Sequence, residues 1–299
     1  MDVSIILLVY NGQKYLDEVL KAIFSQKTSY RFEIIGIDSG SSDQSLEILK
    51  RYDVKIYQIQ NSEFSHGKTR NSGVQLSSGK YVVFLTQDAT PSNDAWLQNI
   101  VSIVASSDKI AGAYSRQLAR PDCNPCEWRD INLGAGPISM VKKINFENDF
   151  EKNTYLSELL KFIQFSNVSS CIRKEQLLET PFDEKIVMVE DQNWCKRALE
   201  NGFEVWYEAS SVVYHSHNHS LKEIYKRHYD YGQSLKAFVE IRMHVFDIVV
   251  YFFRESINDF FFILLLSKSV LWKARWSVRA PFVRFFMRLG LYRGLSRTS

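Results

Sequence analysis

Four short apolar runs in the first third of the chain limit its architecture more than any other feature. They cover residues 3–10, 32–38, 54–59 and 80–85. Short runs rich in Val and Ile are typical of strands that are buried on both faces, as in a parallel sheet. Stretches with helical spacing lie between them, at 13–25, 43–51 and 67–77. This alternation predicts an α/β fold with a mostly parallel central sheet.

The polar residues that follow these runs are the first candidates for a binding site. In an open α/β sheet, ligands bind beyond the carboxyl ends of the strands. Those positions hold Asn11, Asp38 and the pair Gln87–Asp88. Asp38 suits a hydrogen bond to a ribose or a base edge, and Asp88 suits a hard cation such as Mg²⁺ or Mn²⁺. Each carboxylate also has a plainer interpretation, as a residue that shapes its turn or caps the next helix.

Two predicted helix starts carry further charged candidates. Lys68 and Arg70 lie in the first turns of the helix over 67–77, where backbone amides and cations together suit a diphosphate. Glu190–Asp191 opens a predicted helix over 190–201. A carboxylate there can take a proton from a substrate hydroxyl as a general base, or it can simply cap the helix.

Three histidines alternate at His215, His217 and His219, so on a strand they would share one face. No Cys or Glu beside them completes a recognisable zinc set. One imidazole that joins Asp88 on a divalent ion is therefore the simpler metal hypothesis. A structural role for each histidine stays open.

The middle of the chain, over about 116–140, is rich in Pro and Gly and is expected to be a long irregular segment. Cys123 and Cys126 have the CxxC spacing, but the chain holds only four cysteines and no second pair with that spacing. Two plain loop thiols are the favoured interpretation, because neither a zinc set nor a redox context is complete.

The C-terminal part has its own character. No acid follows Asp259, whereas eight Lys and Arg residues do, in a chain with 37 basic and 34 acidic residues. A basic, aromatic tail on an acidic body favours a membrane surface over nucleic acid as a partner. No uncharged stretch in the apolar region 245–266 reaches the roughly 18 residues that a spanning helix needs. Helices that pack on the body, on a second copy or in the membrane interface remain as alternatives.

The first residues lack the basic stretch of a secretory signal, so a cytoplasmic location is expected. The tail adds the expectation of a peripheral position at the inner face of the cell membrane.

The order of the candidate motifs resembles that of the family 2 glycosyltransferases, which have the GT-A fold. The matching residues are Leu8-Val9-Tyr10-Asn11-Gly12, Ile37-Asp38-Ser39-Gly40-Ser41-Ser42-Asp43, Arg70-Asn71, Gln87-Asp88, Glu190-Asp191 and His215. More narrowly, the chain looks like the bacterial rhamnosyltransferase branch. The stretches that carry this likeness are 64–71, 83–89, 114–118 and 213–218.

The resemblance implies a donor-binding role for the N-terminal residues. Tyr10 and Asn11 would line the base pocket, and Asp38 would contact the base or the ribose. Arg70 would approach the base or the diphosphate, with Lys68 nearby to balance the charge of the leaving group.

The resemblance also implies a metal. Asp88 matches the last residue of the family's Asp-x-Asp motif, and Gln87 precedes it in the expected donor site. The first position of the motif is Thr86 in this chain and not an aspartate. His215 matches a position from which the family supplies a metal or diphosphate contact, and His217 is the reserve candidate. Mg²⁺ or Mn²⁺ is the expected cofactor.

The expected reaction is an inverting sugar transfer with Asp191, beside Glu190, as the general base. The donor is expected to be dTDP-rhamnose, and the acceptor a saccharide or a polyprenyl-linked saccharide of a bacterial surface polysaccharide. A UDP-hexose or UDP-N-acetylhexosamine donor on the same fold is the alternative, and a non-catalytic nucleotide-sugar-binding scaffold is the rival from another class. Residues 1–219 would form the GT-A catalytic domain and residues 220–299 a helical extension, through which two copies could associate.

Overall fold

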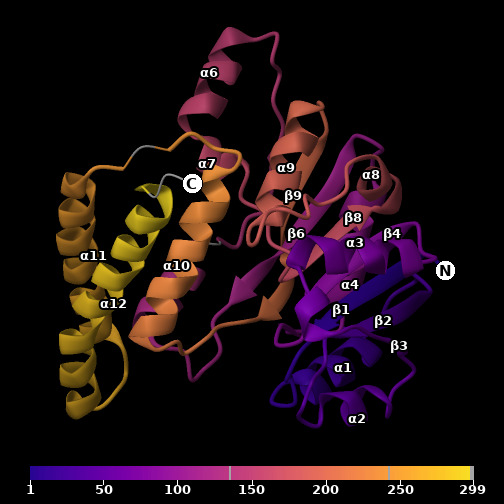
Figure 1. Ribbon diagram of the computed structural model, residues 1–299, viewed down its shortest axis with the longest axis horizontal. Coiled ribbons are helices and arrows are strands. Elements are labelled where there is room, and N and C mark those ends of the chain that lie inside the picture. Colours follow the sequence, from indigo (N-terminus) through magenta and orange to yellow (C-terminus); the bar gives the residue numbers. More distant parts are fainter. Residues whose placement is uncertain (135, 242, 297–299) are drawn as a thin grey trace. The chain divides into compact units, whose positions relative to one another are not determined.

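The computed structural model describes residues 1–134, 136–241 and 243–296, which fold into two compact units (Figure 1). The first, here called the sheet unit, comprises Met1–Gln117, Ala135–Lys185 and Glu190–His215. The second, the helical unit, comprises Leu118–Gly134, Ile186–Val189 and Ser216–Ser299. The last boundary between the units falls at 215/216, and the helical unit also includes two earlier segments.

The N-terminal half of the sheet is parallel, as the sequence predicts. Its strands are β1 (Val3–Val9), β2 (Phe32–Asp38), β3 (Lys55–Gln58) and β4 (Tyr81–Thr86). The helices between them are α1 (Leu16–Phe24), α2 (Ser45–Leu49) and α3 (His66–Leu76), preceded by the short 3-10 helix η1 (Asn61–Glu63). Because β1, β2 and β4 run in the same direction, their carboxyl ends share one edge of the sheet.

The other half of the sheet is antiparallel. It adds β5 (Thr90–Pro91), β6 (Ile110–Leu118), β7 (Met140–Lys142), β8 (Ser169–Arg173) and β9 (Glu204–Tyr214). Among the described residues nine strands form one sheet, in the order β3-β2-β1-β4-β8-β6-β9-β5, with β7 beside β9. β8 is antiparallel to β4, so the residues that precede β8 reach the edge at which β4 ends.

The remaining helices of the sheet unit are α4 (Trp96–Ala105), α6 (Asp149–Ser157), α7 (Leu159–Phe162), α8 (Lys174–Glu179) and α9 (Glu190–Glu200). The core of this unit lies where the inward faces of β1 and β4 meet α1 and α4. Val3, Leu7 and Val83 in the strands, together with Leu16 and Trp96 in the helices, are fully buried there. The expected helix over 190–201 is confirmed by α9, which ends before Gly202 with its φ of 81°.

The helical unit consists of α5 (Pro125–Gly134), α10 (Leu221–Lys236), α11 (Val245–Leu265) and α12 (Val270–Ser296). The expectation of an irregular segment over 116–140 is wrong for α5. Pro125 occupies the first helical position, where its missing N–H costs no hydrogen bond, and Gly134 ends the helix. The two residues that suggest a loop are therefore the start and the end of a helix.

Three glycines bring α10 and α12 unusually close together. A Cβ at Gly294 would lie 2.3 Å from the carbonyl oxygen of Tyr229, and one at Gly290 would lie 2.4 Å from that of Tyr225. A Cβ at Gly232 would lie 2.7 Å from the carbonyl oxygen of Leu291. The two backbones therefore touch where any side chain would force them apart.

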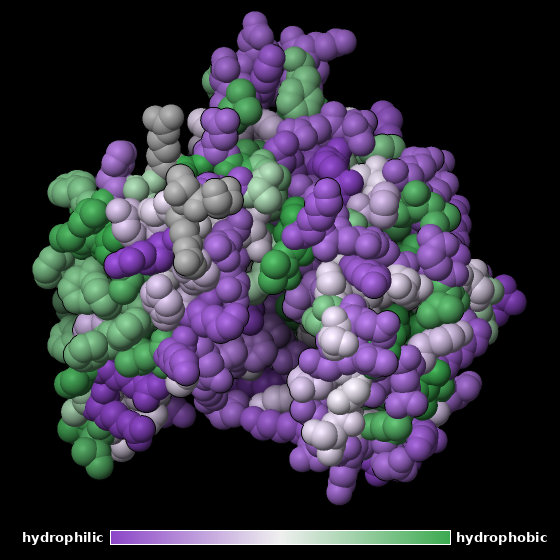
Figure 2. Space-filling model, viewed as in Figure 1, coloured by the Kyte–Doolittle hydropathy of each residue, from purple (hydrophilic) through white to green (hydrophobic). Residues whose placement is uncertain are grey.

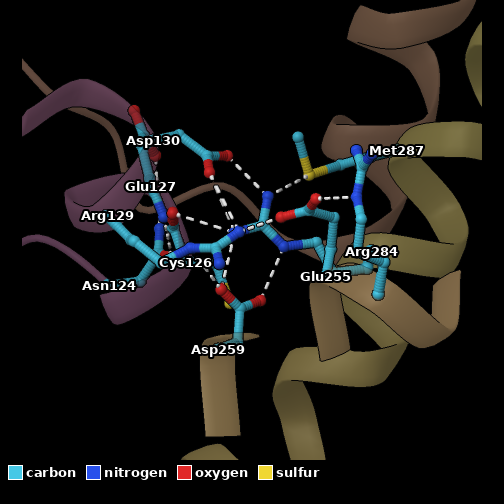
Figure 3. A network of polar contacts seen from close by, with 10 residues as sticks. Asn124, Cys126, Glu127, Arg129, Asp130, Glu255, Asp259, Arg284 and Met287 are labelled. Carbon is cyan, nitrogen blue, oxygen red and sulfur yellow. Dashed lines mark hydrogen bonds and ion pairs between the residues drawn. The ribbon is translucent and has the colours of Figure 1, made fainter. Parts of the chain in front are cut away.

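A network of arginines and carboxylates joins α5, α11 and α12 inside the helical unit (Figure 3). Arg284 is fully buried and donates to Asp259 at 2.6 and 2.7 Å and to Asp130 at 2.5 and 2.9 Å. Arg129 pairs with Glu255 and, at 2.9 Å, with Asp259. Because buried charges need partners, these pairs fix α5 to the two C-terminal helices.

Within the described parts of the chain, no helix combines the length and the hydropathy needed to cross a bilayer.

Candidate active site

The predicted donor-site residues gather at the carboxyl edge of the parallel strands. The register places Val9 beside Asp38 and Leu8 beside Thr86, so the residues that follow β1, β2 and β4 are neighbours. The backbone N–H of Thr86 donates to the carbonyl of Val168 at 3.1 Å, which ties the end of β4 to the segment before β8.

Asn11 and Asp38 build the turn at this edge. Asn11 lies in the left-handed region with a φ of 48°, which asparagine tolerates well, and its Oδ1 accepts from the Ser42 N–H at 2.8 Å. Asp38 is 1% exposed, and its Oδ2 accepts at 3.2 Å from the N–H groups of Gly40 and Ser41. Its Oδ1 is buried and has no hydrogen-bond partner among the described residues. Such an oxygen is suited to accept from a ligand hydroxyl or base N–H.

Gln87 holds the backbone beside this turn. Its Oε1 accepts from the Tyr10 N–H, and its Nε2 donates to the Tyr10 carbonyl, both at 2.9 Å. A Cβ at Gly12 would lie 2.3 Å from Gln87 Oε1, so a side chain at this position would displace the Gln87 amide from Tyr10. The Tyr10 side chain, 47% exposed, is left available to a ligand.

Asp88 and His215 face each other, with 3.7 Å between Asp88 Oδ1 and His215 Nε2. The pairing of β5 with β9 sets Thr90 opposite Tyr214 and so brings the two segments together. Gln117 Oε1 lies 3.0 Å from His215 Nδ1, so it accepts a hydrogen bond in the tautomer that carries the proton on Nδ1, and Nε2 is the ring nitrogen on the side of Asp88. A carboxylate and an oriented imidazole at this separation fit a divalent cation.

The three histidines do not share a face of a strand, because β9 ends at Tyr214 and all three follow it. His217 and His219 belong to the helical unit, where their rings stack with 4.8 Å between centroids. The His217 N–H donates to Glu127 Oε1 at 2.9 Å.

Glu190 and Asp191 form a pair at the start of α9. Glu190 is 4% exposed, and its Oε1 accepts from Arg70 Nη1 at 2.7 Å and from Asn167 Nδ2 at 3.3 Å. Asp191 remains partly exposed, and its carboxylate accepts from the backbone N–H groups of Asn167 at 2.9 Å and Gln192 at 2.8 Å. Arg70 therefore turns inward to the acid pair, whereas Lys68 on the same helix is exposed.

Although part of Asp191 is exposed, the surrounding protein desolvates its carboxylate and raises its pKa, and the negative charge of Glu190 raises the pKa further, to about 7. The hydrogen bond from the Asn167 amide and the charge of Arg70 oppose this rise. A carboxylate with a pKa near neutrality is a far better proton acceptor than an ordinary surface aspartate. We regard Asp191 as the member of the pair that can act as a general base.

The residue before this pair is strained. Val189 has a φ of 59°, a left-handed conformation that β-branched residues rarely adopt. The N–H of Met188 donates to Ser234 Oγ at 3.1 Å and holds the segment within the helical unit. Strain of this kind costs about 1–3 kcal/mol and is found mainly near functional groups.

Two residues at this edge are not among the site residues that the sequence predicts. Asn167 precedes the antiparallel strand β8, and Gln117 lies near the end of β6, within the stretch 114–118 that carries the rhamnosyltransferase likeness. Asn167 contacts both residues of the acid pair, and Gln117 contacts His215. The likeness of that stretch is a signal for Gln117, whereas Asn167 has only its polar side chain beside a buried strand.

The parallel half-sheet, the antiparallel strands beside it and the polar edge define a class of protein, those with the GT-A fold. The structure is similar to that of the mannosyltransferase PcManGT from Pyrobaculum calidifontis in complex with GDP-Man and Mn²⁺. The two have a TM-score of 0.60 and 14% identity, and the match covers 98% of this chain and 85% of the other. This likeness confirms the predicted fold.

The chain belongs to glycosyl transferase family 2, whose model matches residues 4–179. It is 32% identical to the O-antigen chain rhamnosyltransferase RfbN of Salmonella typhimurium, over 78% of this chain and 72% of the relative. It is 30% identical to the O-antigen chain rhamnosyltransferase WbaN of Salmonella anatum, over 70% of this chain and 64% of the relative. The expected family is thereby confirmed, and the chain is a glycosyltransferase.

Proposed function

We propose that the chain transfers L-rhamnose from dTDP-rhamnose to a saccharide or lipid-linked acceptor in the synthesis of a bacterial surface polysaccharide. The two Salmonella relatives named as O-antigen chain rhamnosyltransferases support the sugar and the process. The observation in the molecule that carries the proposal concerns three aspartates. Asp38 and Asp88 lie at the ends of parallel strands on one edge of the sheet, and Asp191 is bound to Asn167, which precedes β8 at that edge. Each has a different chemical environment, which suits three different tasks.

The nucleotide is proposed to bind at the turn after β1 and β2. The unpartnered Oδ1 of Asp38 would accept from the ribose or the base, and Tyr10 and Asn11 would line the base pocket. Gln87 supports this pocket through the Tyr10 backbone. Lys68 is the exposed cation on α3 for the diphosphate, whereas Arg70 reaches it only if it leaves Glu190.

Asp88 and His215 are proposed to hold a divalent cation, Mg²⁺ or Mn²⁺, with His217 as the alternative imidazole. Gln117 fixes the tautomer that such a site requires. The cation would neutralise the charge that builds up on the diphosphate leaving group.

Asp191 is proposed to take the proton of the acceptor hydroxyl while that oxygen attacks C1 of the sugar. The bond between C1 and the diphosphate oxygen breaks in the same step, and the nucleoside diphosphate leaves with the electron pair. A single displacement of this kind inverts the anomeric carbon. Arg70 and Asn167 would keep Glu190 in place, so that its charge maintains the basicity of Asp191.

Calorimetric titration of dTDP-rhamnose, UDP-glucose and UDP-N-acetylglucosamine, each with and without Mg²⁺, tests the donor and the metal site. We expect only dTDP-rhamnose to bind tightly, in a metal-dependent manner, and at least about tenfold more weakly to Asp88→Ala. Asp94→Ala is the matched control, because Asp94 lies on the surface of the same unit and pairs with Lys27.

Other outcomes of this titration are informative as well. Preference for a UDP-sugar would replace the donor and keep the metal site. Metal-dependent binding that survives in Asp88→Ala would remove Asp88 from the metal site. Tight donor binding without turnover in the presence of acceptor would favour a non-catalytic scaffold.

A further inference from the structure

The longest uncovered apolar surface of the helical unit runs along α11. Eight exposed residues recur at helical spacing: Phe246, Val249, Val250, Phe253, Ile257, Phe260, Phe261 and Leu264. At 3.6 residues per turn they fall within about 120° of the helix circumference and extend for about 27 Å. We call this set the outer face of α11; Figure 2 shows hydrophobic residues gathered over this helix.

Two carboxylates in the second half of α11 point the other way. Asp259 is 1% exposed and is bound by Arg284, and Glu255 is mostly buried against Arg129. The helix therefore directs these carboxylates into the protein and its aromatic rings outward, which reverses the usual arrangement of a surface helix. The buried network in Figure 3 is what holds this orientation.

Basic and aromatic residues flank the C-terminal end of this face. Val270 and Leu271 are 84% and 82% exposed in the first turn of α12. Lys268 lies over the Trp272 ring at 5.9 Å from its centroid, and Arg279 lies over Trp276 at 5.3 Å. Tryptophan beside lysine and arginine is the composition of segments that settle at a membrane–water interface.

The charges near the outer face decide whether its partner is a second copy of this chain or an anionic lipid surface. From residue 245 to 296 the chain has three acids. Asp247 accepts from the His244 N–H at the start of α11, at 2.7 Å, and Glu255 and Asp259 are engaged in the buried network. Arg254, Lys268 and Arg275 are exposed in the same stretch. A second copy of this surface would bring the same bases without a free carboxylate to pair with them. An anionic lipid surface complements both the bases and the apolar face.

We propose that the outer face of α11 inserts into the interfacial layer of an anionic lipid bilayer, with α11 parallel to the membrane plane. Lys268 and Arg275 contact the lipid headgroups, and Trp272 lies at the level of the headgroups. The sequence leaves the region 245–266 open between packing on the body, on a second copy and in the membrane interface. The exposure of its apolar side chains assigns the apolar contact to α11, and the basic residues near the start of α12 supplement it. The proposal does not depend on the identity of the sugar donor.

Flotation of the full chain with phosphatidylcholine vesicles, with and without phosphatidylglycerol, tests the surface. We expect binding to be strongest with phosphatidylglycerol and to fall about tenfold for each ring removed in Phe253→Gln and Phe261→Gln. Lys268→Gln and Arg275→Gln should each weaken binding about fivefold, on the anionic vesicles only. Phe150→Gln is the matched control: Phe150 is 79% exposed on α6 of the sheet unit, and its loss should change nothing.

Failure of the proposal would be visible in the same samples. Absence of vesicle binding by the unchanged chain, or binding that survives Phe253→Gln and Phe261→Gln together, overturns it. A dimer in sedimentation equilibrium that these two substitutions dissociate, without vesicle binding, would assign the face to a second copy. Donor binding and turnover with a soluble acceptor should be unaffected in all these variants, so the test is separate from that of the proposed function.

Discussion

Each unit buries arginine among carboxylates, and the two arrangements differ in their balance of charge. In the helical unit Asp130, Glu255 and Asp259 each have a guanidinium partner, and Arg284 alone serves Asp259 and Asp130. In the sheet unit one guanidinium, that of Arg70, serves Glu190, and Asp191 has only backbone N–H donors. The network of the helical unit, in which the charges are balanced, holds α5, α11 and α12 together. The surplus carboxylate carries the raised pKa that proton transfer requires.

The largest effect on the rate should come from removal of the Asp191 carboxylate. Asp191→Asn keeps the shape and an acceptor for the Asn167 N–H but cannot take a proton, so kcat should fall about 10²–10⁴-fold. Donor affinity measured by calorimetry should stay within about twofold of the original value. Parallel loss of donor binding and activity would contradict the base role.

Removal of an arginine from the balanced set should instead cost stability. Arg284→Met leaves Asp259 and Asp130 without their main partner, and we expect the free energy of unfolding to fall by about 3–5 kcal/mol. Urea unfolding followed by circular dichroism measures the change. Arg254→Met is the control, because Arg254 is exposed and its surface pair with Glu255 should contribute less than about 1 kcal/mol. Equal effects for the two arginines would show that the buried pairs do not hold the unit together.

The charge of Glu190 should be visible in the pH profile. The rate should fall below a pH of about 7 as Asp191 takes up a proton, because a base acts only when ionised. Glu190→Gln keeps an acceptor for Arg70 but removes the second-largest cause of the raised pKa, after burial, so the midpoint of the acid limb should move down by about one unit.

Glu200→Gln, at the far end of α9, is the control for this measurement. An unmoved midpoint in Glu190→Gln would mean that Asp191 is not the group that titrates.

The smallest effect is a gain in stability in the sheet unit. The pKa of Asp191 is higher in the folded chain than in the unfolded one, so its contribution to stability is lost as the pH rises toward and through about 7. Asp191→Asn does not ionise, and its melting temperature at pH 8 should exceed that of the original by roughly 2–4 °C, or about 1 kcal/mol. The difference in melting temperature should shrink as the pH falls toward the ordinary pKa of aspartate. A gap that does not change with pH would contradict the raised pKa.

The sequence predicts the parallel half of the fold because its signals are local. Each apolar run from 3 to 85 is a strand with a helix before the next one, and the edge residues Asn11, Asp38 and Asp88 follow from that alternation. The direction of β8 depends on its neighbours in space and not on its own residues. The contacts of Asn167 with Glu190 and Asp191 therefore cannot be predicted from the sequence.

The helical unit was harder to predict for a related reason. Proline can begin a helix and glycine can end one as readily as either interrupts it, so the residues of α5, from Pro125 to Gly134, resemble a loop in the sequence. Asp259 looked like an interruption of an apolar helix, whereas it faces Arg284, 25 residues further on, and Arg129. Which way a mixed helix faces is decided by partners that are remote in the sequence.

The helical unit is built from segments that are far apart in the sequence, so it can form only after the last of them has been synthesised. Residues 118–134 leave the ribosome long before Asp259 and Arg284, so α5 must wait for partners that are made last. A chain cut after residue 219 would retain β1 to β9 and the acid pair, but it would leave Asp130, Arg129 and Cys126 uncovered. Fragments that end at residue 219 should therefore aggregate, because α5 has lost the helices that it packs against.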